Sequence, residues 1–270
     1  MSTLFKSLFI TLIAATLLSC TSTTKKGAVG ADRRQLLLVS EADVADMART
    51  AYATVLTDAK EAGTLNTNTR QLERVRSIAA KLIPQIKIFR ADALKWQWET
   101  NVIDSEELNA WCMHGGKIAV YTGIIEKLKL TDDELAAIIG HEMAHALREH
   151  SREQISQEMA TTFTLNIGSA LLGLGTVGAT VAQTGSDLML KLPNSRTHET
   201  EADRIGVELA ARAGFDPRAA ISLWEKMGAL SPSKGQPSWL STHPSGKQRI
   251  ADLEIYAARV APLYKSALAN

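Results

Sequence analysis

The sequence has little of several features that would assign a protein to a class directly. It holds two cysteines, Cys20 and Cys112, too few for a disulfide framework. The formal net charge is +1, so no overall field favours nucleic acid or an acidic substrate. The apolar run 8–18 is shorter than the ~20 residues that a membrane-spanning helix needs. What remains, 45% apolar and 22% charged residues over 270 positions, is typical of a globular protein with a sizeable core.

The N-terminal residues have the pattern of a secretory signal. Lys6 supplies a positive charge, residues 8–18 form an h-region, and Leu17-Leu18-Ser19-Cys20 resembles a bacterial lipobox. That resemblance implies that residues 1–19 are removed, that Cys20 is acylated and that lipid holds the protein to a membrane. Thr21 replaces the aspartate that retains lipoproteins at the inner membrane, which favours the periplasmic face of the outer membrane. The alternatives are an uncleaved anchor and a signal peptide with an incidental cysteine.

The rest of the chain is expected to form a flexible tether over residues 20–35 and one mostly helical α+β domain over residues 36–270. Apolar spacing predicts helices at 41–60 and up to Leu82 within residues 36–84. Short segments rich in aromatic and β-branched residues predict a small antiparallel sheet within residues 85–123, at 86–89, 96–102, 110–113 and 118–121. Gly115-Gly116 indicates a hairpin between the last two segments. Residues 124–270 are expected to be helical almost throughout.

One predicted helix contains His141-Glu142-Met143-Ala144-His145 in an otherwise apolar setting. Thr131 and Glu134 form a capping box at its start. A helix that is apolar nearly all round must be buried, so its polar residues need partners. His141 and His145, four residues apart, share a face and can bind one zinc ion.

Glu142 lies about 100° round the same helix from His141. It is therefore placed to act as a general base on a water that zinc activates, and to return the proton to the leaving amine. A chance occurrence of the motif on a surface helix is the alternative. The charged stretch from Arg148 to Glu153 is interpreted as solvated surface, and His150 lies on another face of the helix.

A second motif, Ser195-Arg196-x-x-Glu199-x-x-Ala202-Asp203, follows on another predicted helix. Together with the first, it resembles the gluzincin metallopeptidases that include HtpX and the CAAX prenyl protease, and their lipoprotein members LoiP and BepA. The resemblance implies a zincin-like core with one Zn²⁺ per chain. It assigns the third metal ligand to Glu199, and it allows Asp203 to hold the second ring nitrogen of a ligand histidine. Glu201 is then expected to face solvent.

The same resemblance implies an edge strand that flanks the active-site helix and pairs with extended substrate. The segment 109–123 is expected to form this edge and its hairpin, with Ile118, Ala119 and Val120 binding substrate. His114, where the family commonly has proline, is interpreted as an exposed turn residue.

A late motif, His243-Pro244 with Arg249, also resembles the family. His243 either stabilises the oxyanion or fills the open position of zinc and keeps the enzyme latent. Arg249 is assigned to substrate binding by this resemblance. A capping histidine with Arg249 in a structural ion pair is the alternative for both residues.

Residues 160–186 carry no charge and include glycines at short intervals. They are interpreted as a flap over the cleft, with a re-entrant or paired hairpin at a membrane as the alternative. A single span is excluded because it would place the two metal-binding helices on opposite sides of the membrane.

The leading functional hypothesis is a zinc endopeptidase that cleaves misfolded or misassembled envelope proteins. The alternative is a chaperone-like assembly factor for outer-membrane proteins, with latent or weak protease activity and contact with the assembly machinery. A structural zinc domain is disfavoured because three protein ligands leave one position open. Nucleic acid is not expected as a partner.

Overall fold

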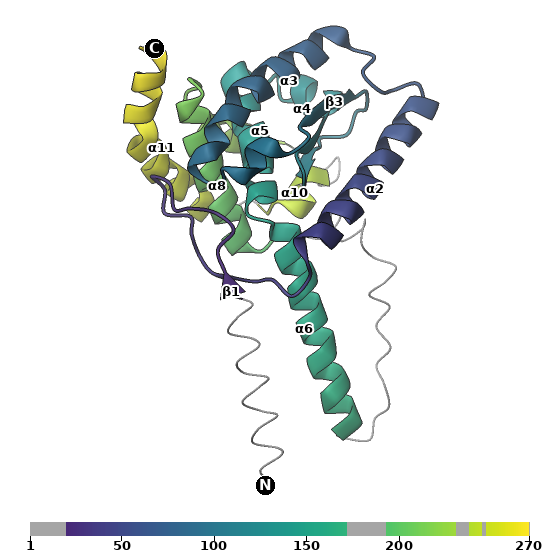
Figure 1. The fold of residues 1–270 in the computed structure, drawn as a ribbon. Coiled ribbons are helices and arrows are strands. Elements are labelled where there is room, and N and C mark those ends of the chain that lie inside the picture. Colours follow the sequence, from purple (N-terminus) through teal and green to yellow (C-terminus); the bar gives the residue numbers. More distant parts are fainter. Residues whose placement is uncertain (1–19, 172–192, 231–237, 245–246, 270) are drawn as a thin grey trace.

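A computed structural model describes the chain except for residues 1–19, 172–192, 231–237, 245–246 and 270 (Figure 1). The expected signal peptide lies outside the described residues. The expected α+β class is confirmed, because helices surround one small sheet. The helices are α2 (Glu41–Glu61), α3 (Thr69–Leu82), α4 (Thr122–Lys127), α5 (Asp132–Leu147), α6 (His150–Leu171), α8 (Arg196–Arg212), α9 (Ala219–Gly228), α10 (Ser238–Thr242) and α11 (Lys247–Leu268). Short 3₁₀ helices η1 (Ile83–Ile88) and η2 (Asp92–Lys95) follow α3.

The sheet contains strands β3 (Glu99–Ile103), β4 (Ala110–Met113) and β5 (Lys117–Tyr121) in the order β3-β5-β4. The hairpin is confirmed, since β4 and β5 are antiparallel and Gly115 and Gly116 take the positive φ angles that their turn requires. The expectation of an all-antiparallel sheet is wrong, because β3 runs parallel to β5. Although β4 follows β3 in the sequence, β5 lies between these two strands in the sheet. The segment 86–89, expected to be a strand, lies mostly in η1.

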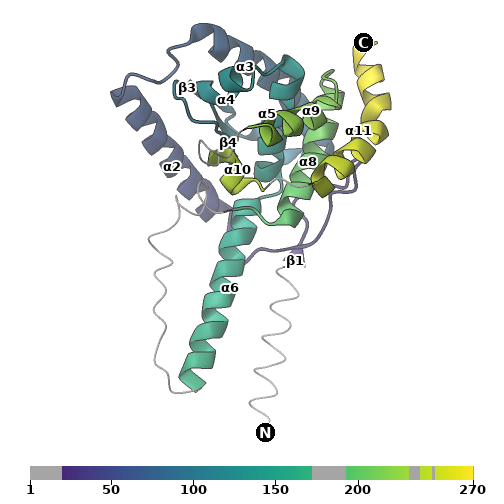
Figure 2. The same ribbon diagram turned by 180° about the vertical axis from the view of Figure 1, so that it is seen from behind.

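Helix α5 lies at the centre of the molecule, between β4 and α8 (Figure 2). The predicted capping box begins it, because Thr131 Oγ1 accepts from the Glu134 N–H at 3.2 Å and Glu134 accepts from the Thr131 N–H at 2.8 Å. From Glu134 to Leu147 every side chain is buried. The sequence predicted that this helix is buried, polar side chains included, because the residues around its motif are almost all apolar.

Glycines allow α5 and α8 to cross closely. A Cβ atom built on Gly206 would lie 2.8 Å from the His141 backbone nitrogen, and one built on Gly140 would lie 3.0 Å from the Gly206 carbonyl oxygen. Both distances are shorter than ordinary van der Waals contact. The close approach brings the histidines of α5 next to the first turns of α8.

The N-terminal segment from Ser22 to Leu37 packs against this helical core. Val29 and Ala31 are 1% and 3% exposed, and the Ala28 N–H donates to buried Glu208 at 2.7 Å. The short strands β1 (Cys20–Thr21) and β2 (Gln35–Leu36) pair within it. The flexible tether expected over 20–35 does not fit this packing, because apolar residues hidden among the polar ones anchor the segment.

Helix α6 projects away from the body of the molecule (Figure 1). Residues 160–171 of the uncharged stretch continue this helix, and the remainder of the expected flap lies outside the described residues. Phe163 on α6 is 57% exposed. Within the described part of the chain, no helix combines the length and the apolar character needed to cross a membrane.

Candidate active site

Four side chains converge where α5 crosses α8. His141 and His145 come from α5, Glu199 from the first turn of α8, and His243 from the residue after α10. Each offers one ligand atom, and these atoms all lie within 4.8 Å of one another. Nε2 of His145 lies 3.0 Å from Nε2 of His141, and Nδ1 of His243 lies 2.9 Å from Oε1 of Glu199. The structure therefore brings the three expected ligands together, and His243 offers a fourth ligand atom to the same group.

The donor chemistry of this group fits a zinc ion. Nδ1 of His141 is 2.9 Å from Asp203, whose carboxylate only accepts, so Nε2 presents its lone pair to the cluster. Burial lowers the pKa of His141 to about 3, which keeps its ring neutral. Lone pairs that face one another beside the anionic Glu199 need a cation between them. Two imidazoles and a carboxylate are an established ligand set for catalytic zinc.

Asp203 and Arg249 lie behind the ligands. Asp203 occupies the position that the sequence predicted for it, against the ring nitrogen of His141 that faces away from the cluster. The Arg249 guanidinium binds both Asp203 and Glu199 and stacks over Trp224 at 3.7 Å. Its side chain is only 8% exposed. The geometry therefore matches the alternative expected for Arg249, a structural ion pair, and its assignment to substrate binding stays a prediction.

Glu142 is buried beside the ligands and is not one of the convergent four. The indole N–H of Trp239 donates to its Oε1 at 2.8 Å, and His243 Nε2 lies 3.4 Å from the same oxygen. Burial raises the pKa of Glu142 to about 7, although His145 and Trp239 oppose this rise. A carboxylate with this pKa can both accept and return a proton near neutral pH. Sequence reasoning missed Trp239, which no motif marks.

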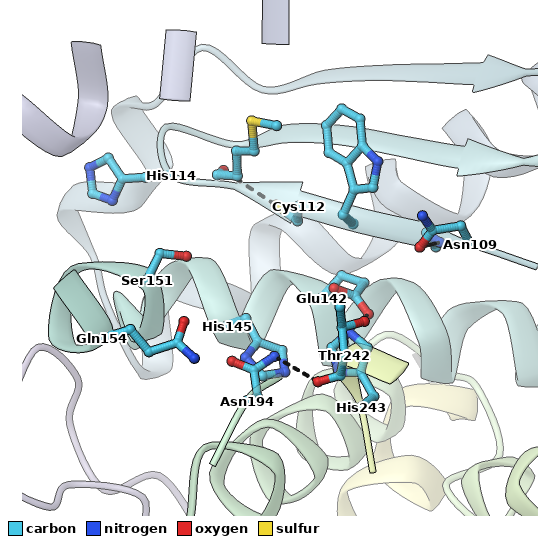
Figure 3. A pocket seen from close by; sticks show the side chains of 13 residues that line it. Asn109, Cys112, His114, Glu142, His145, Ser151, Gln154, Asn194, Thr242 and His243 are labelled. Atoms are coloured by element: carbon cyan, nitrogen blue, oxygen red, sulfur yellow. Dashed lines mark hydrogen bonds and ion pairs between the residues drawn. The ribbon is translucent and has the colours of Figure 1, made fainter. Parts of the chain in front are cut away.

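A groove runs along α5 beneath the free edge of β4 (Figure 3). Its floor includes Glu142, His145 and His243, one wall is the strand from Asn109 to His114, and the other wall is polar, with Ser151, Gln154, Asn194 and Thr242. An extended peptide lying in this groove would pass beside the metal ligands.

The edge strand of this groove is β4, not β5. Ile118, Ala119 and Val120 belong to β5, which pairs with β3 on one side and β4 on the other. All three are buried, and no edge of β5 is free to accept a further strand. The substrate contact expected of these residues therefore does not fit the register. The hairpin was predicted, but which of its strands faces the active site depends on how β3 joins the sheet.

The family model for peptidase family M48 matches residues 69–257, which is more than half of the chain and includes both motifs. The chain belongs to peptidase family M48.

Relatives of this M48 chain include mitochondrial metalloendopeptidases named OMA1. The protein from Arabidopsis thaliana is 43% identical over 56% of this chain and 30% of its own length. The protein from Schizosaccharomyces pombe is 41% identical over 58% of this chain and 46% of its own length. The β-barrel assembly-enhancing protease of Escherichia coli K12 is 27% identical over 65% of this chain and 38% of its own length. The chain thus spans less than half the length of each of these three relatives.

These relatives contradict the expected location. The N-terminal pattern predicted the periplasmic face of the outer membrane, whereas the OMA1 proteins from Arabidopsis thaliana, Schizosaccharomyces pombe and Bos taurus are described as mitochondrial. The similarity to the β-barrel assembly-enhancing protease does not restore that expectation.

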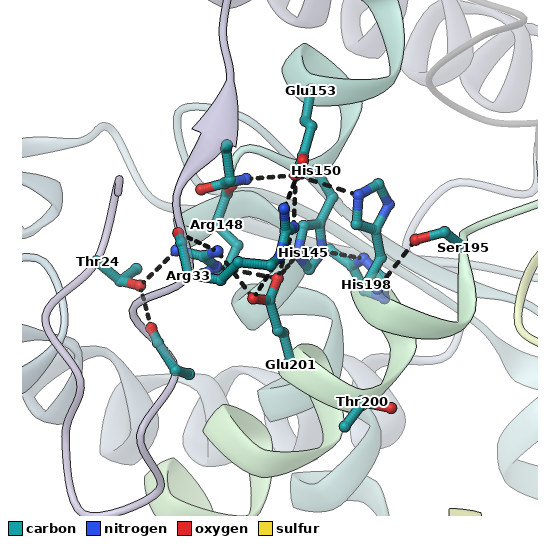
Figure 4. A network of polar contacts seen from close by, with 12 residues as sticks. Thr24, Arg33, His145, Arg148, His150, Glu153, Ser195, His198, Thr200 and Glu201 are labelled. Carbon is teal, nitrogen blue, oxygen red and sulfur yellow. Dashed lines mark hydrogen bonds and ion pairs between the residues drawn. The ribbon is translucent and has the colours of Figure 1, made fainter. Parts of the chain in front are cut away.

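A network of buried charges surrounds the far side of His145 (Figure 4). None of Arg148, Glu149, His150 and Glu153 is more than 3% exposed, so the prediction of solvated surface is wrong for this stretch. Glu201, expected to face solvent, is 7% exposed and binds Arg148 at 2.9 Å. Sequence patterns predict exposure for such a dense run of charges because the charged partners that bury it, in the N-terminal segment and in α8, are far away in the sequence.

His114 is half-buried, contrary to the exposed turn expected for it. Its side chain is 6% exposed, and its ring centroid lies 4.8 Å from that of Trp96. His114, Glu41 and Glu149 are close enough together to hold a metal ion. Arg90 already pairs with both carboxylates and Arg152 pairs with Glu149, so two arginines balance the two carboxylates without one.

Proposed function

We propose that this M48 chain is a zinc-dependent metalloendopeptidase in which Glu142 is the general base. The observation that supports this most directly is the position of Glu142, which has a pKa of about 7 and lies in the groove beside His141, His145 and Glu199 without joining them as a ligand. When bound, zinc supplies a Lewis acid that polarises water and the scissile carbonyl. Glu142 takes the proton from water and gives it to the leaving amine. Trp239 fixes the carboxylate oxygen that faces it.

We further propose that substrate binds as an additional strand on β4. The antiparallel ladder alternates, and the Tyr121 N–H donates to the Asn109 carbonyl, so Ala110 and Cys112 direct their backbone groups to the free edge. Backbone pairing accepts many sequences. It therefore suits unfolded or misassembled proteins, including the envelope proteins that the sequence suggested as substrates.

The deciding experiment compares wild type with Glu142→Gln on casein, with zinc and after chelation. We expect wild type to cleave casein, chelator to abolish cleavage, and Glu142→Gln to lose roughly 10²–10⁴-fold in rate, the usual contribution of a general base. Zinc content is measured in both proteins. Equal cleavage by the two zinc-loaded proteins would refute the role of Glu142, and no cleavage by zinc-loaded wild type would refute the simple protease.

A second candidate function is that of an assembly factor with latent protease activity. His243 favours it, because an imidazole in the fourth ligand position closes the site that a catalytic metal leaves open. A latent factor would bind an unfolded outer-membrane protein through β4 and leave it intact. Binding without cleavage by wild type, together with cleavage by a His243 variant, would favour this function.

Acylation of Cys20 remains part of the proposal. Cys20 begins β1, at the start of the described chain, and its side chain lies outside the description. Mass spectrometry of the intact protein tests the modification. A protein that retains residues 1–19, or one with an unmodified Cys20, would contradict it.

A further inference from the structure

We propose that Glu201 and His150 are positioning residues for the metal ligand His145, and that Arg33 of the N-terminal segment holds Glu201 in place. The inference rests on the metal site of the proposed function, but it does not depend on peptide cleavage. It assigns roles to the buried charged stretch after the first motif and to the segment before the first helix.

A continuous chain of contacts leads from the ligand to the N-terminal segment (Figure 4). Nδ1 of His145 lies 2.8 Å from Nδ1 of His150, and Nε2 of His150 lies 3.1 Å from Oε2 of Glu201. Arg33 Nε donates to Oε1 of Glu201 at 3.0 Å, and Arg148 Nη2 donates to the same oxygen at 2.9 Å. The residues that connect His145 to Glu201 are all buried, since His150 is 1% exposed and Glu201 is 7% exposed.

The chemistry of these groups fixes which nitrogen carries each proton. The Glu201 carboxylate only accepts, so Nε2 of His150 donates to it. His145 faces the metal cluster through Nε2, and a neutral ring that ligates there carries its proton on Nδ1. Within the described part of the chain, the acceptor that faces this proton is Nδ1 of His150. Glu201 thus selects the His150 tautomer, and His150 in turn selects the His145 tautomer that ligates.

The two ligand histidines are therefore oriented from the same helix by two different routes. Asp203 holds His141 directly, at 2.9 Å, whereas Glu201 holds His145 through one intervening ring. His150 is kept in plane by His198, which stacks on it with ring centroids 4.2 Å apart and 12° between planes. Partners behind metal ligands fix ring orientation and raise metal affinity.

Arg33 connects the N-terminal segment to this network of hydrogen bonds. Its guanidinium donates to both oxygens of Glu153, at 2.7 and 2.8 Å, as well as to Glu201. Two arginines, Arg33 and Arg148, thus balance two buried carboxylates. The Gln35 side-chain amide also donates to the Arg148 carbonyl oxygen at 2.6 Å. Loss of Arg33 would leave two buried carboxylates with one arginine, Arg148, to balance them, which is costly in free energy.

The test measures zinc affinity in the full chain, by competition with a chromogenic chelator, in a Glu142→Gln background so that catalysis plays no part. We expect Glu201→Gln to weaken zinc binding about 10- to 100-fold, the range found when partners behind metal ligands are removed. The matched control is Glu208→Gln. Glu208 lies on the same helix, is 0% exposed and also anchors the N-terminal segment through the Ala28 N–H, but its partners are Ala28, Val29 and Arg212 and not a metal ligand.

Two further variants separate positioning from general stability. His150→Phe keeps a flat ring beside His198 but cannot bond to His145, and we expect it to match Glu201→Gln in zinc affinity and to change the visible spectrum of the cobalt-substituted protein. Arg33→Ala should weaken zinc binding, and Arg33→Lys should recover part of the loss. Thermal unfolding of each metal-free variant gives the structural effect alone.

The proposal is overturned if Glu201→Gln and His150→Phe bind zinc within about twofold of the background protein. It is also overturned if Glu208→Gln, at a similar loss of thermal stability, loses as much affinity. Failure of the proposed protease would appear separately, as zinc-loaded wild type that does not cleave casein.

Discussion

His243 is the residue whose position has the greatest consequence for activity. Its Nδ1 lies 3.2 Å from His141 Nε2, on the side where a catalytic metal site is open, while its Nε2 lies 3.4 Å from Glu142. The sequence left two roles open, an oxyanion contact and a ligand that blocks the site. The geometry favours the blocking role, because one ring occupies the ligand position and touches the base at the same time.

We expect His243→Ala to raise casein cleavage about 3- to 10-fold, which is the gain if the open form of wild type is populated a tenth to a third of the time. The measurement is the initial rate at saturating zinc, with zinc content determined for both proteins. Glu106→Gln, at a side chain that is 95% exposed and does not line the groove, is the control. A fall in rate with full zinc occupancy would support the oxyanion role instead.

Residues on one helix were predictable from the sequence, and residues that depend on distant partners were not. Fixed spacing placed His141, Glu142 and His145, and the second motif placed Glu199 and Asp203 by resemblance. Trp239 is marked by no motif, and the buried position of His150 was not predicted because its partners Glu201 and His198 come from another helix. Arg249 is assigned to substrate binding by resemblance to the late motif, whereas in the structure two buried carboxylates hold it.

At the scale of elements, strand β4 joins the sheet to the active site. The sequence predicted β4 and β5 nearly residue for residue, because β-branched residues and a diglycine turn mark a hairpin locally. It did not predict that β3 runs parallel to β5, since strand order depends on contacts between distant segments. That order decides that β4, and not β5, offers its edge to a peptide.

We expect Cys112→Pro to raise KM for casein about 3- to 10-fold with little change in kcat, because one backbone hydrogen bond contributes about 0.5–1.5 kcal/mol. The substitution removes an N–H that faces the free edge and leaves the ladder to β5 intact. Cys112→Ala, which keeps the N–H, should behave like wild type within about twofold. Equal effects of the two substitutions would remove the case for strand pairing.

The crossing of α5 and α8 is a second feature at this scale. Alanine in place of glycine inside a helix normally gains about 1 kcal/mol, but a Cβ on Gly206 meets the His141 backbone at 2.8 Å, and overpacking costs ~1–3 kcal/mol. We therefore expect Gly206→Ala to lower both the melting temperature and the zinc affinity. Calorimetry and chelator competition measure these two effects.

The control for this crossing is Gly228→Ala at the end of α9. A Cβ there meets nothing within 4 Å, so the substitution should be neutral or stabilising. If Gly206→Ala behaved like its control, the close crossing would not position the ligand helices.

At the scale of the whole molecule, the N-terminal segment, α6 and α8 are joined by buried charges as well as by apolar contact. The sequence predicted the helices on each side of this junction but expected a free tether and a solvated surface where the junction lies. Composition could not show that these residues are buried, because Arg33, Glu153 and Glu201 have the charges of surface residues, and the ion pairs between them form only when distant segments fold together. Long-range pairing of buried charges is thus the part of this fold that local patterns did not reveal.

This junction makes stability depend on pH. Burial alone would raise the pKa of Glu153, but hydrogen bonds from Arg33, His198 and Gln35 outweigh burial and lower it to about 2. Because the folded pKa lies below the ordinary value of 4.5, the stabilising contribution of Glu153 is complete above about pH 5 and is lost as the pH falls toward 2. We expect Glu153→Gln to lower the melting temperature of the metal-free protein by about 4–8 °C at pH 7, as loss of a buried charged hydrogen-bond partner implies.

That difference should shrink steadily between pH 5 and pH 3, because protonated Glu153 in wild type also loses its charge. Melting temperatures of both proteins in chelator, measured across this range, test the prediction. Glu106→Gln, at a side chain that is 95% exposed, serves as the control and should differ little from wild type at any pH. A difference that persisted unchanged to pH 3 would mean that the shape of Glu153, and not its charge, holds the N-terminal segment to the helices.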